Sequence, residues 1–587
     1  MKSKNKLKVI LSSVFFLILV IGAAYAYLGT FNINLNNNVA VNINSTSPGN
    51  LSFIANSTQL NIQVPDTSMA QYNTNNTVAA KEDTGFVDIT LTGAEGFLTT
   101  CSYDLVYEYN TNSDIYGKTV PVTTDATKEI TIEVNGMNGN NHFATETNFN
   151  FDTSKGWSNA TSSTGAKVTL VTGATLKSLG TEQSVRWKVT GRYYNLDLNQ
   201  YALSGKSFTG KIYVENVNCS TKDGTTVKKG YETILANNGG KTAIEAKTAD
   251  FTTVETSNAG MFSYTEGTGK TYYYRGAVDN NWVKYGKFKA DQIVYRGFRD
   301  DTTNTDVWFD SVNNQANYID YPTLAECQTG VDYDSTYNYK CKEVVYANKG
   351  DDMYWRIIRV DKNNKIKMIY AGSKAPSENA KVAITGADTN MGFTAYNNKY
   401  DKAEYVGFQY TTGSQRGTNT NSTIKTYLDN WYTKYFNENI GTSRFVKTTF
   451  CNDRNTSRTW ASNGRDFEYA PYTRLSSSPP TPTFECNNAD VVTNNLGLIT
   501  EDEIVLAGGK IGTDNSAFYL NNNMAYWAGS PLVFIDSGSH VFGLDPFGSF
   551  LDGLVDSRNV AVRGVVSLSS ESKLLGSGKY NDVYTVN

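Results

Sequence analysis

Hydrophobic and polar residues alternate with a period of two along many short stretches of the first half of the chain. In residues 86–91, for example, Val87, Ile89 and Leu91 share one face, which is the pattern of a half-buried strand. Turn-rich clusters separate these stretches. Because the strands are short and no long helical pattern interrupts them, they predict an antiparallel β-sandwich. The predicted strands cover 86–91, 102–109, 130–134, 168–171, 185–189 and 208–217.

The second half has a mixed pattern. Residues 353–360 and 365–370 alternate on either side of a polar turn and predict a β-hairpin. Residues 422–436 repeat apolar side chains at helical spacing and predict an amphipathic helix. Thr500 is followed by Glu503 just before an apolar run, which is the pattern of a capping box at the start of a second helix. An α+β domain is therefore expected here.

Together these patterns predict a mostly β chain with a minor α+β part, in which an N-terminal antiparallel β-sandwich precedes the α+β domain. The predicted segments are a signal peptide or membrane anchor at 1–29, a polar stalk and first strand at 30–80, the sandwich at 81–222, a linker at 223–256 and the α+β domain at 257–587 with an insertion near 300–350.

The N-terminus combines a basic segment with an apolar one. Residues 1–8 contain four lysines, and residues 9–26 follow without a charge and are mostly apolar. Ala24-Tyr25-Ala26 fits the cleavage site of a signal peptide. The apolar segment is also just long enough to remain as a single membrane span. Either alternative predicts an extracellular, cell-surface or membrane-anchored protein.

Composition and charge exclude some classes of protein. Hydrophobic residues make up 39% and charged residues 19% of the 587 residues, which is typical of folded domains and unlike a disordered chain. The formal net charge is −4, whereas binding of nucleic acid needs a concentrated basic surface. We therefore expect no nucleic-acid partner.

Six cysteines are present, and none of them forms a Cys-x-x-Cys pair. In an exported chain an even number of cysteines predicts disulfides, and the alternative is that some are buried free thiols. We expect each cysteine to pair with its nearest partner in the same domain, and the first pair to join the two sheets of the sandwich. The expected pairs are Cys101–Cys219, Cys327–Cys341 and Cys451–Cys486.

Several motifs of the second half occur in a recognisable order, at residues 354–359, 421–432, 451–454, 498–509, 526–531 and 562–568. Together they resemble a C-type-lectin-like module of uncharacterised Firmicutes surface proteins, related in fold to formylglycine-generating enzymes. Such modules usually have Arg-Pro where this chain has Arg563-Gly564. The first half, through its strand pattern and residues 194–205, resembles the Ig-like sandwich of secreted matrix-fibre and camelysin-type proteins.

In the resembled lectin-like fold, long loops near the C-terminus carry the ligand contacts. Residues 536–558 mix aromatic and charged side chains, and aromatic faces with fixed polar groups suit sugar or peptide ligands. The alternative is an ordinary turn-rich surface, and for Trp527 we favour a role as a core or loop anchor. The candidate ligand-binding residues are Trp527, Asp536, His540, Phe542, Asp545, Phe547, Asp552 and Arg558.

Motifs of catalysis and of metal binding are missing from the sequence. The two histidines, His142 and His540, are not part of an H-E-x-x-H motif, and no Gly-x-Ser-x-Gly elbow or P-loop occurs. We therefore expect no catalytic residue, no metal and no cofactor. Calcium could bind carboxylates, although solvated acidic turns are the commoner explanation. The acidic positions concerned are Asp300-Asp301, Asp351-Asp352, Asp552 and Asp556.

The sequence thus predicts an exported bacterial adhesin, in which the sandwich is a spacer and the lectin-like module binds an extracellular glycan or protein ligand. The N-terminal segment would contact the membrane. Two alternatives remain. The chain could be a self-associating subunit of an extracellular fibre or surface layer, or an exported enzyme of the formylglycine-generating type that uses Cys451 and Cys486.

Overall fold

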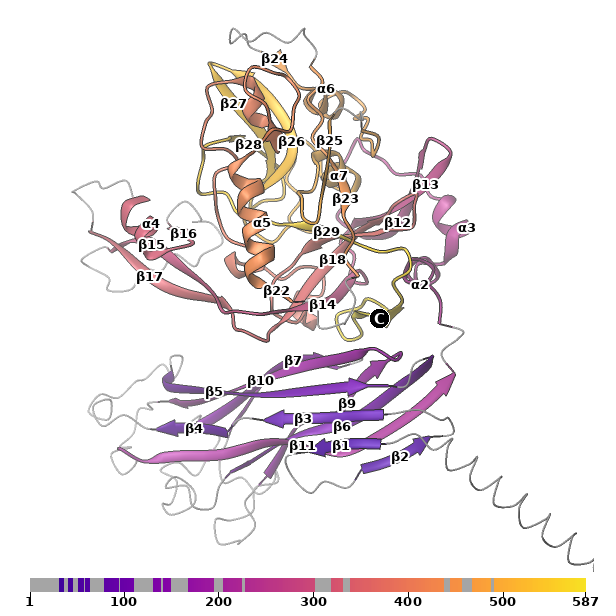
Figure 1. Cartoon of the computed structure of the whole chain (residues 1–587), viewed down its shortest axis with the longest axis vertical. Coiled ribbons are helices and arrows are strands. Elements are labelled where there is room, and N and C mark those ends of the chain that lie inside the picture. The colour runs from indigo at the N-terminus through magenta and orange to yellow at the C-terminus, as the bar shows by residue number, and fades with distance from the viewer. Residues whose placement is uncertain are drawn as a thin grey trace, which may run out of the picture. The chain divides into compact units, whose positions relative to one another are not determined.

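The computed structural model describes residues 31–35, 41–45, 51–57, 59–63, 79–93, 96–109, 130–138, 141–148, 167–194, 204–223, 227–300, 318–330, 338–437, 444–456, 467–486 and 490–587. The chain is mostly β with a minor helical part, which confirms the predicted fold class (Figure 1). It divides into two compact units, unit 1 with Met1–Val227 and Asn587, and unit 2 with Lys228–Val586.

The predicted leader, residues 1–29, lies outside the described residues. Within the ranges that the structure describes, no helix is long and apolar enough to cross a membrane.

The described strands of unit 1 form two sheets (Figure 1). They are β1 (Phe31–Leu35), β2 (Val41–Ser45), β3 (Leu51–Ser57), β4 (Gln59–Gln63), β5 (Ala79–Thr92), β6 (Phe97–Tyr109), β7 (Ile130–Asn138), β8 (Asn141–Asn148), β9 (Lys167–Ser178), β10 (Glu182–Tyr194) and β11 (Ser207–Asp223). One sheet has the order β1-β3-β5-β10-β7-β8, and the other has the order β2-β11-β6-β9, with β4 also paired to β11. Most neighbours are antiparallel, and the exceptions among these pairs are β1 with β3 and β2 with β11.

Residues 31–63 depart from the expected polar stalk with a single strand. Their described part forms β1 to β4, and these strands extend both sheets of the sandwich. Their apolar residues explain the difference, because Phe53 of β3 and Leu60 and Ile62 of β4 are fully buried in the core of unit 1.

Side chains from both sheets meet in one buried core. Val87, Ile89 and Leu91 are fully buried, as the alternation predicts. Trp187 of β10 is also fully buried, and its indole N–H donates a hydrogen bond of 2.9 Å to the Tyr103 hydroxyl of β6. Because β10 and β6 belong to different sheets, this bond links the two layers.

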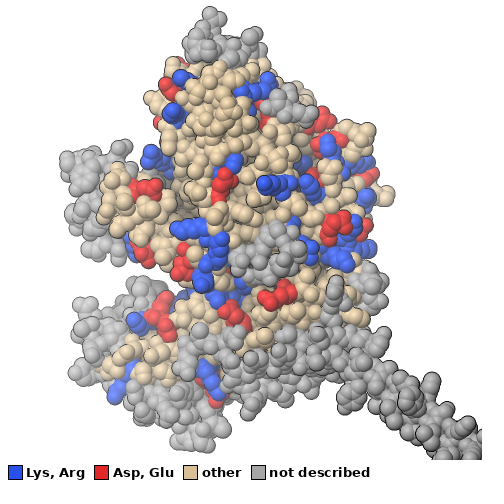
Figure 2. All heavy atoms as spheres, in the orientation of Figure 1, with Lys and Arg blue, Asp and Glu red and all other residues tan. Residues whose placement is uncertain are grey.

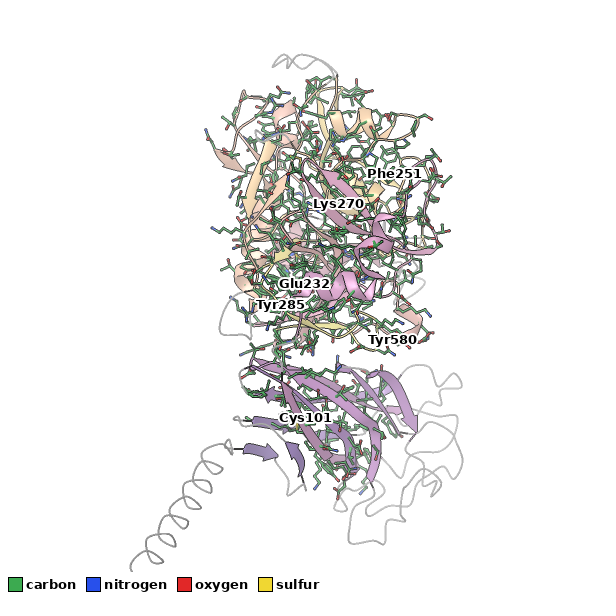
Figure 3. The ribbon with its side chains drawn as sticks, turned by 90° about the vertical axis from the view of Figure 1, so that its right-hand side faces the viewer. Cys101, Glu232, Phe251, Lys270, Tyr285 and Tyr580 are labelled. Carbon is green, nitrogen blue, oxygen red and sulfur yellow. A yellow bond between two sulfur atoms is a disulfide. The ribbon has the colours of Figure 1, made fainter. Side chains whose placement is uncertain are left out.

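The predicted disulfide of unit 1 is present, but it does not join the two sheets. Cys101 lies opposite Cys219 in the register of β6 and β11, which are neighbours in the same sheet. Figure 3 shows Cys101 among the strands of unit 1. The expectation of a bridge between the sheets was wrong, because the two cysteines belong to adjacent strands.

A large mixed sheet organises unit 2. Its described strands are β12 (Asn258–Glu266), β13 (Gly269–Gly276), β14 (Trp282–Phe288), β18 (Asp352–Val360), β19 (Ile366–Tyr370), β22 (Phe436–Asn437), β29 (Val565–Leu568), β30 (Leu574–Leu575) and β31 (Tyr584–Val586). The main order is β12-β13-β18-β14-β31-β30, and β19 pairs with both β18 and β29. The predicted hairpin is thus confirmed as β18 and β19.

Both predicted helices of unit 2 are present. Helix α5 (Thr423–Tyr435) has Ser422 as its N-cap, and its face with Ile424, Leu428 and Trp431 is buried. Helix α7 (Glu501–Leu506) begins with the predicted capping box between Thr500 and Glu503. The other helices among the described residues are α2 (Gly230–Asn237), α3 (Gly240–Glu245), α4 (Leu324–Gly330) and α6 (Ala470–Leu475), with short 3₁₀ turns η5 (Glu378–Ala380), η6 (Ala387–Thr389) and η7 (Ala403–Val406).

Part of the segment expected as a linker, residues 223–256, is folded into unit 2. Helices α2 and α3 contribute Ile234, Leu235 and Ile244 to its hydrophobic core, and each of these side chains is buried. The boundary between the two units accordingly lies before these helices, at Val227 and Lys228.

The predicted insertion near 300–350 contains a small sheet of its own. Its described strands are β15 (Gln292–Asp300), β16 (Tyr318–Tyr321) and β17 (Asn338–Ala347), in the order β16-β15-β17. Together with α4, they reach away from the body of unit 2 (Figure 1). The predicted Cys327–Cys341 disulfide ties α4 to β17, and Arg296 forms a buried ion pair of 2.7 Å with Asp320.

Smaller sheets complete unit 2. One contains β24 (Phe467–Glu468), β26 (Tyr526–Ile535), β27 (Gly538–Leu544) and β28 (Phe550–Leu554), in that order. Two further antiparallel pairs join β20 (Gln409–Tyr410) to β21 (Thr420–Asn421) and β23 (Thr448–Cys451) to β25 (Val491–Asn494).

Candidate functional site

Two of the predicted ligand-binding aromatics lie in the core. Trp527 on β26 is fully buried, and its indole N–H donates a hydrogen bond of 2.8 Å to the Thr394 carbonyl. Phe542 on β27 is also fully buried and lies near the rings of Tyr472 and Phe550. Because both side chains are buried, the expectation that they contact a ligand at the surface was wrong. Trp527 is the core anchor that its sequence context favours.

The other predicted residues are more exposed, and β27 separates several of them. Asp536 lies in the turn before this strand, whereas Asp545 and Phe547 lie after it. Phe547 is 51% exposed, and Asp545 accepts the backbone N–H groups of Phe547 and Ser549. The Asp545 carboxylate is therefore already hydrogen-bonded within its own loop.

The structure brings together one pair of the predicted residues. Nδ1 of His540 on β27 lies 2.7 Å from Oδ1 of Asp552 on β28. Arg558 is exposed in the segment after β28. The predicted stretch therefore provides one histidine–aspartate pair on a sheet and several separate surface residues.

A polar pocket of about 480 Å³ opens elsewhere in unit 2. It is formed by the β18–β19 hairpin, the β23–β25 pair, the N-terminal end of α7 and the chain around the Cys451–Cys486 disulfide. Its lining residues are Glu266, Arg359, Asp361, Lys362, Asn363, Lys367, Thr449, Phe450, Cys451, Asp453, Arg474, Thr483, Phe484, Glu485, Cys486, Val491, Thr493, Thr500, Asp502, Glu503 and Ser530.

A buried ion-pair cluster lies on the hairpin side of the pocket. Arg359 and Lys367 are opposite each other in the register of β18 and β19, so their cationic groups are neighbours. Glu503 of α7 pairs with both. Its Oε1 lies 2.7 Å from Nζ of Lys367 and 2.9 Å from Nε of Arg359. Desolvation by burial raises the pKa of Glu503, but these two cations outweigh it and hold the pKa below its ordinary value.

Helix α7 is held at both ends, which fixes its acidic side chains. The Thr500 hydroxyl accepts the backbone N–H of Glu503, and the Glu503 carboxylate accepts the backbone N–H of Thr500. At the other end, a guanidinium nitrogen of Arg275 donates to the carbonyls of Val505 and Leu506. A cation at this end satisfies terminal carbonyls and favours the helix dipole.

A second ion-pair cluster lies on the loop side. Arg474 at the end of α6 donates from Nε to Oδ1 of Asp502 at 2.7 Å and from Nη1 to Oδ2 of Asp453 at 2.6 Å. Desolvation raises the pKa of Asp502, although its bonds with Arg474 oppose that rise. The two clusters involve adjacent residues of α7, Asp502 and Glu503, and both restrain side chains that line the pocket through charge-assisted bonds.

The predicted Cys451–Cys486 disulfide is present and lines the pocket. It connects the end of β23 to the segment that carries Phe484. The bond closes a loop of 35 residues in sequence separation, and this loop also carries Asp453 and Arg474. One wall of the pocket is therefore held covalently.

Cations cover the two aromatic rings of the pocket. The guanidinium of Arg359 lies 4.5 Å from the centre of the Phe484 ring, and Nζ of Lys367 lies 5.2 Å from that of Phe450. Phe484 also makes an edge-on contact with Tyr273. These cation–π contacts restrain the two cationic side chains further.

Several polar groups of the pocket retain hydrogen-bonding capacity. Arg359 has no hydrogen bond from its Nη1 or Nη2 to any described residue. Thr449 and Thr493 face each other across β23 and β25, both are exposed, and their hydroxyls have no partner in the described ranges. The Ser530 hydroxyl accepts the backbone N–H of Glu501 and can still donate.

Among the described residues, no group of three or more His, Cys, Asp or Glu side chains is placed to hold a metal ion. Two carboxylates considered for calcium already have protein partners. Asp352 lies 2.6 Å from Nζ of Lys287, and Asp351 accepts the backbone N–H of Asn348. Asp301 lies outside the described residues.

Apart from Cys451 and Cys486, the sequence did not single out the pocket residues as a site, although it contains a signal for some of them. Arg359 and Lys367 are charged positions inside strands made mostly of apolar residues, and such positions need an internal partner. Their partner, Glu503, was recognised only as part of a capping box. Pairing of residues so distant in sequence depends on the tertiary fold.

Comparisons with known proteins do not identify a family. No protein-family model matches the chain, and no curated protein matches it.

Proposed function

We propose that the chain is an exported, surface-exposed ligand-binding protein and that the polar pocket of unit 2 is its binding site. The observation that carries this proposal is the pocket's combination of fixed walls and unused hydrogen-bonding groups. Ion pairs and a disulfide hold its sides, while Arg359, Thr449 and Thr493 keep donors that no described residue accepts. Such preorganisation lowers the entropic cost of binding a ligand.

The cysteines support an extracellular setting. All six are paired, and the three disulfides are compatible with an oxidising environment outside the cytoplasm. With the charged and apolar N-terminal pattern, they support export to the cell surface. In this proposal the sandwich of unit 1 is a spacer, and unit 2 is a C-type-lectin-like head of a Firmicutes surface protein.

The distribution of charge supports a small ligand over nucleic acid. On the face shown in Figure 2, basic and acidic side chains are interspersed over the described residues of unit 2. Nucleic-acid binding needs a continuous basic surface that neutralises several phosphates. Glycans or exposed segments of proteins are therefore the proposed partners.

A pocket-filling variant tests the proposal. Thr493 is exposed on β25, so Thr493→Trp places a large ring in the pocket without removing a buried contact. We expect the purified full chain, in mild detergent, to bind members of a glycan or protein array, and the variant to lose that binding with unchanged circular dichroism. Lys289→Gln, an exposed change outside the pocket, is the control. Binding that survives Thr493→Trp would remove the pocket from the proposal.

A second candidate is an exported enzyme of the formylglycine-generating type. The observation that favours it is the position of the Cys451–Cys486 disulfide in the wall of the pocket. Under this alternative, replacing either cysteine with serine abolishes oxidation of a cysteine-containing peptide. Absence of any such activity in the wild-type chain would eliminate the enzyme and leave the binding protein.

A further inference from the structure

We propose that the pocket recognises a sugar that carries a single carboxylate. This inference rests on the proposed binding function and names the class of ligand. It draws on three properties of the described residues, namely a fixed guanidinium with unused donors, a set of unused hydroxyls and an excess of acidic side chains in the lining.

The guanidinium of Arg359 is arranged to bind a carboxylate. Glu503 accepts its Nε–H, and the ring of Phe484 supports its plane, so the group is fixed before a ligand arrives. Its side chain is 14% exposed, and Nη1 and Nη2 donate to no described residue. Two parallel N–H groups in one plane match the two oxygens of a carboxylate.

The remaining unused groups suit a polyhydroxylated ligand. The hydroxyls of Thr449 and Thr493 are each able to donate and to accept, and the Ser530 hydroxyl still has its proton to donate. Groups of this kind complement sugar hydroxyls, which also donate and accept. A peptide would instead expose apolar side chains, for which the pocket offers little surface because cations already cover Phe450 and Phe484.

The same rings argue against neutral sugars as the preferred ligand. A neutral sugar commonly gains affinity by placing its apolar face on an aromatic ring. In this pocket Lys367 and Arg359 lie over the rings of Phe450 and Phe484. A neutral sugar would therefore lose both the stacking contact and the carboxylate contact.

The charge of the lining argues against polyanions. Six carboxylates line the pocket with four Lys and Arg side chains, so acidic groups are in excess. Asp361 and Glu485 account for the excess, because the described structure shows no ion pair for either one. These carboxylates would repel every charge of a polyanion, whereas they would repel a ligand with a single carboxylate on Arg359 less strongly.

Titration calorimetry of the full chain tests the ligand class with matched pairs of sugars. The pairs are a disaccharide ending in glucuronic acid against its counterpart ending in glucose, and sialyllactose against lactose. The first pair represents hexuronic acids and the second represents nine-carbon sugar acids. We expect the acidic member of at least one pair to bind roughly tenfold more tightly or better, as for a hydrogen bond to a charged group.

The possible outcomes separate this inference from the proposed function. Equal affinity for the acidic and neutral members, with both lost in Thr493→Trp, would overturn the carboxylate inference and leave the pocket as a binding site. Tighter binding of a peptide with a free C-terminal carboxylate than of either acidic sugar would also overturn the sugar class. Acidic sugars that bind the Thr493→Trp variant as tightly as they bind the wild type would overturn both the carboxylate inference and the pocket as a binding site.

Arginine variants test the residue that carries the inference. Arg359→Lys keeps the charge beside Glu503 but removes the planar fork, so we expect the preference for the acidic member to fall roughly tenfold. A double variant, Thr449→Val with Thr493→Val, keeps Arg359 and its ion pair. This variant should weaken the binding of both the acidic and the neutral sugar of a pair and preserve the ratio of their affinities. A preference that persists in Arg359→Lys would overturn the assignment, and Lys289→Gln is the charge control.

Discussion

Oε1 of Glu503 lies 2.7 Å from Nζ of Lys367, and their side chains are only 2% and 5% exposed. The pair connects helix α7 to the β18–β19 hairpin, two elements that are more than a hundred residues apart in sequence. Because Arg359 pairs with the same carboxylate, Glu503 is shared by two neighbouring cations of the pocket wall.

Removing that carboxylate should destabilise unit 2. Glu503→Gln preserves the capping box, since glutamine also accepts the N-cap hydrogen bond, but it leaves Lys367 and Arg359 without their counter-ion. We expect a loss of about 3–5 kcal/mol in the free energy of unfolding, measured with urea. The control is Glu571→Gln, which removes an exposed ion pair with Lys229 and should leave the unfolding curve unchanged. An equal effect of both changes would contradict this account.

The pH dependence of stability should change when Glu501 is replaced. Burial, together with repulsion from Asp502, raises the pKa of Glu501 well above its ordinary value. Its Oε2 atom has no hydrogen-bond partner among the described residues. A carboxyl with a raised folded pKa stabilises the fold fully below its unfolded pKa, and that contribution is lost as the pH rises through the folded pKa.

Glu501→Gln removes the ionisation that causes this loss. We expect the variant to unfold at the same urea concentration as wild type near pH 4 and at a higher concentration near pH 8. The comparison uses unfolding curves at both pH values. A variant that is less stable than wild type near pH 8 would show that the charged carboxylate has a stabilising partner.

Opening the Cys451–Cys486 disulfide should affect both stability and binding. Its loop of 35 residues predicts a loss of about 4 kcal/mol in the free energy of unfolding for Cys451→Ser with Cys486→Ser. The freed loop carries Arg474 and Phe484, so binding of the array ligand should also be lost. The double variant Cys327→Ser with Cys341→Ser lies outside the pocket and should retain binding. Binding unaffected by the first double variant would contradict the proposed role of this wall.

The core of unit 1 should depend on Trp187. This side chain is fully buried and hydrogen-bonded to Tyr103 in the opposite sheet. Trp187→Ala leaves a cavity and should lower the free energy of unfolding by about 3–5 kcal/mol. Phe547→Ala removes an aromatic side chain that is 51% exposed, and its effect on stability should stay within about 0.5 kcal/mol. Similar losses in the two variants would contradict the assigned core.

The sequence was informative where local patterns determine the structure. The β18–β19 hairpin follows from strand alternation, and α5 and α7 follow from apolar spacing and from the N-cap residues Ser422 and Thr500. The disulfide pairing also followed from proximity along the chain. Strands β1 and β2 were missed because Asn-rich segments surround them, although Phe31, Ile33 and Leu35 alternate with asparagine in β1; the two strands pair with β3 and β11.

The candidate site was not predictable in the same way. Aromatic residues near the C-terminus suggested a binding surface, yet Trp527 and Phe542 are used to fill the core. The pocket is assembled from Arg359, Arg474 and Glu503, which belong to three separate segments. No local pattern encodes their contacts, because these arise only when the hairpin and the two short helices pack together.

A crystal structure of the chain soaked with the acidic disaccharide would show whether the pocket binds the sugar. We expect electron density for the sugar in the pocket, with its carboxylate on Nη1 and Nη2 of Arg359 and its hydroxyls near Thr449 and Thr493. Density for the sugar only at the surface of residues 536–558, with the pocket empty at a saturating concentration, would contradict it.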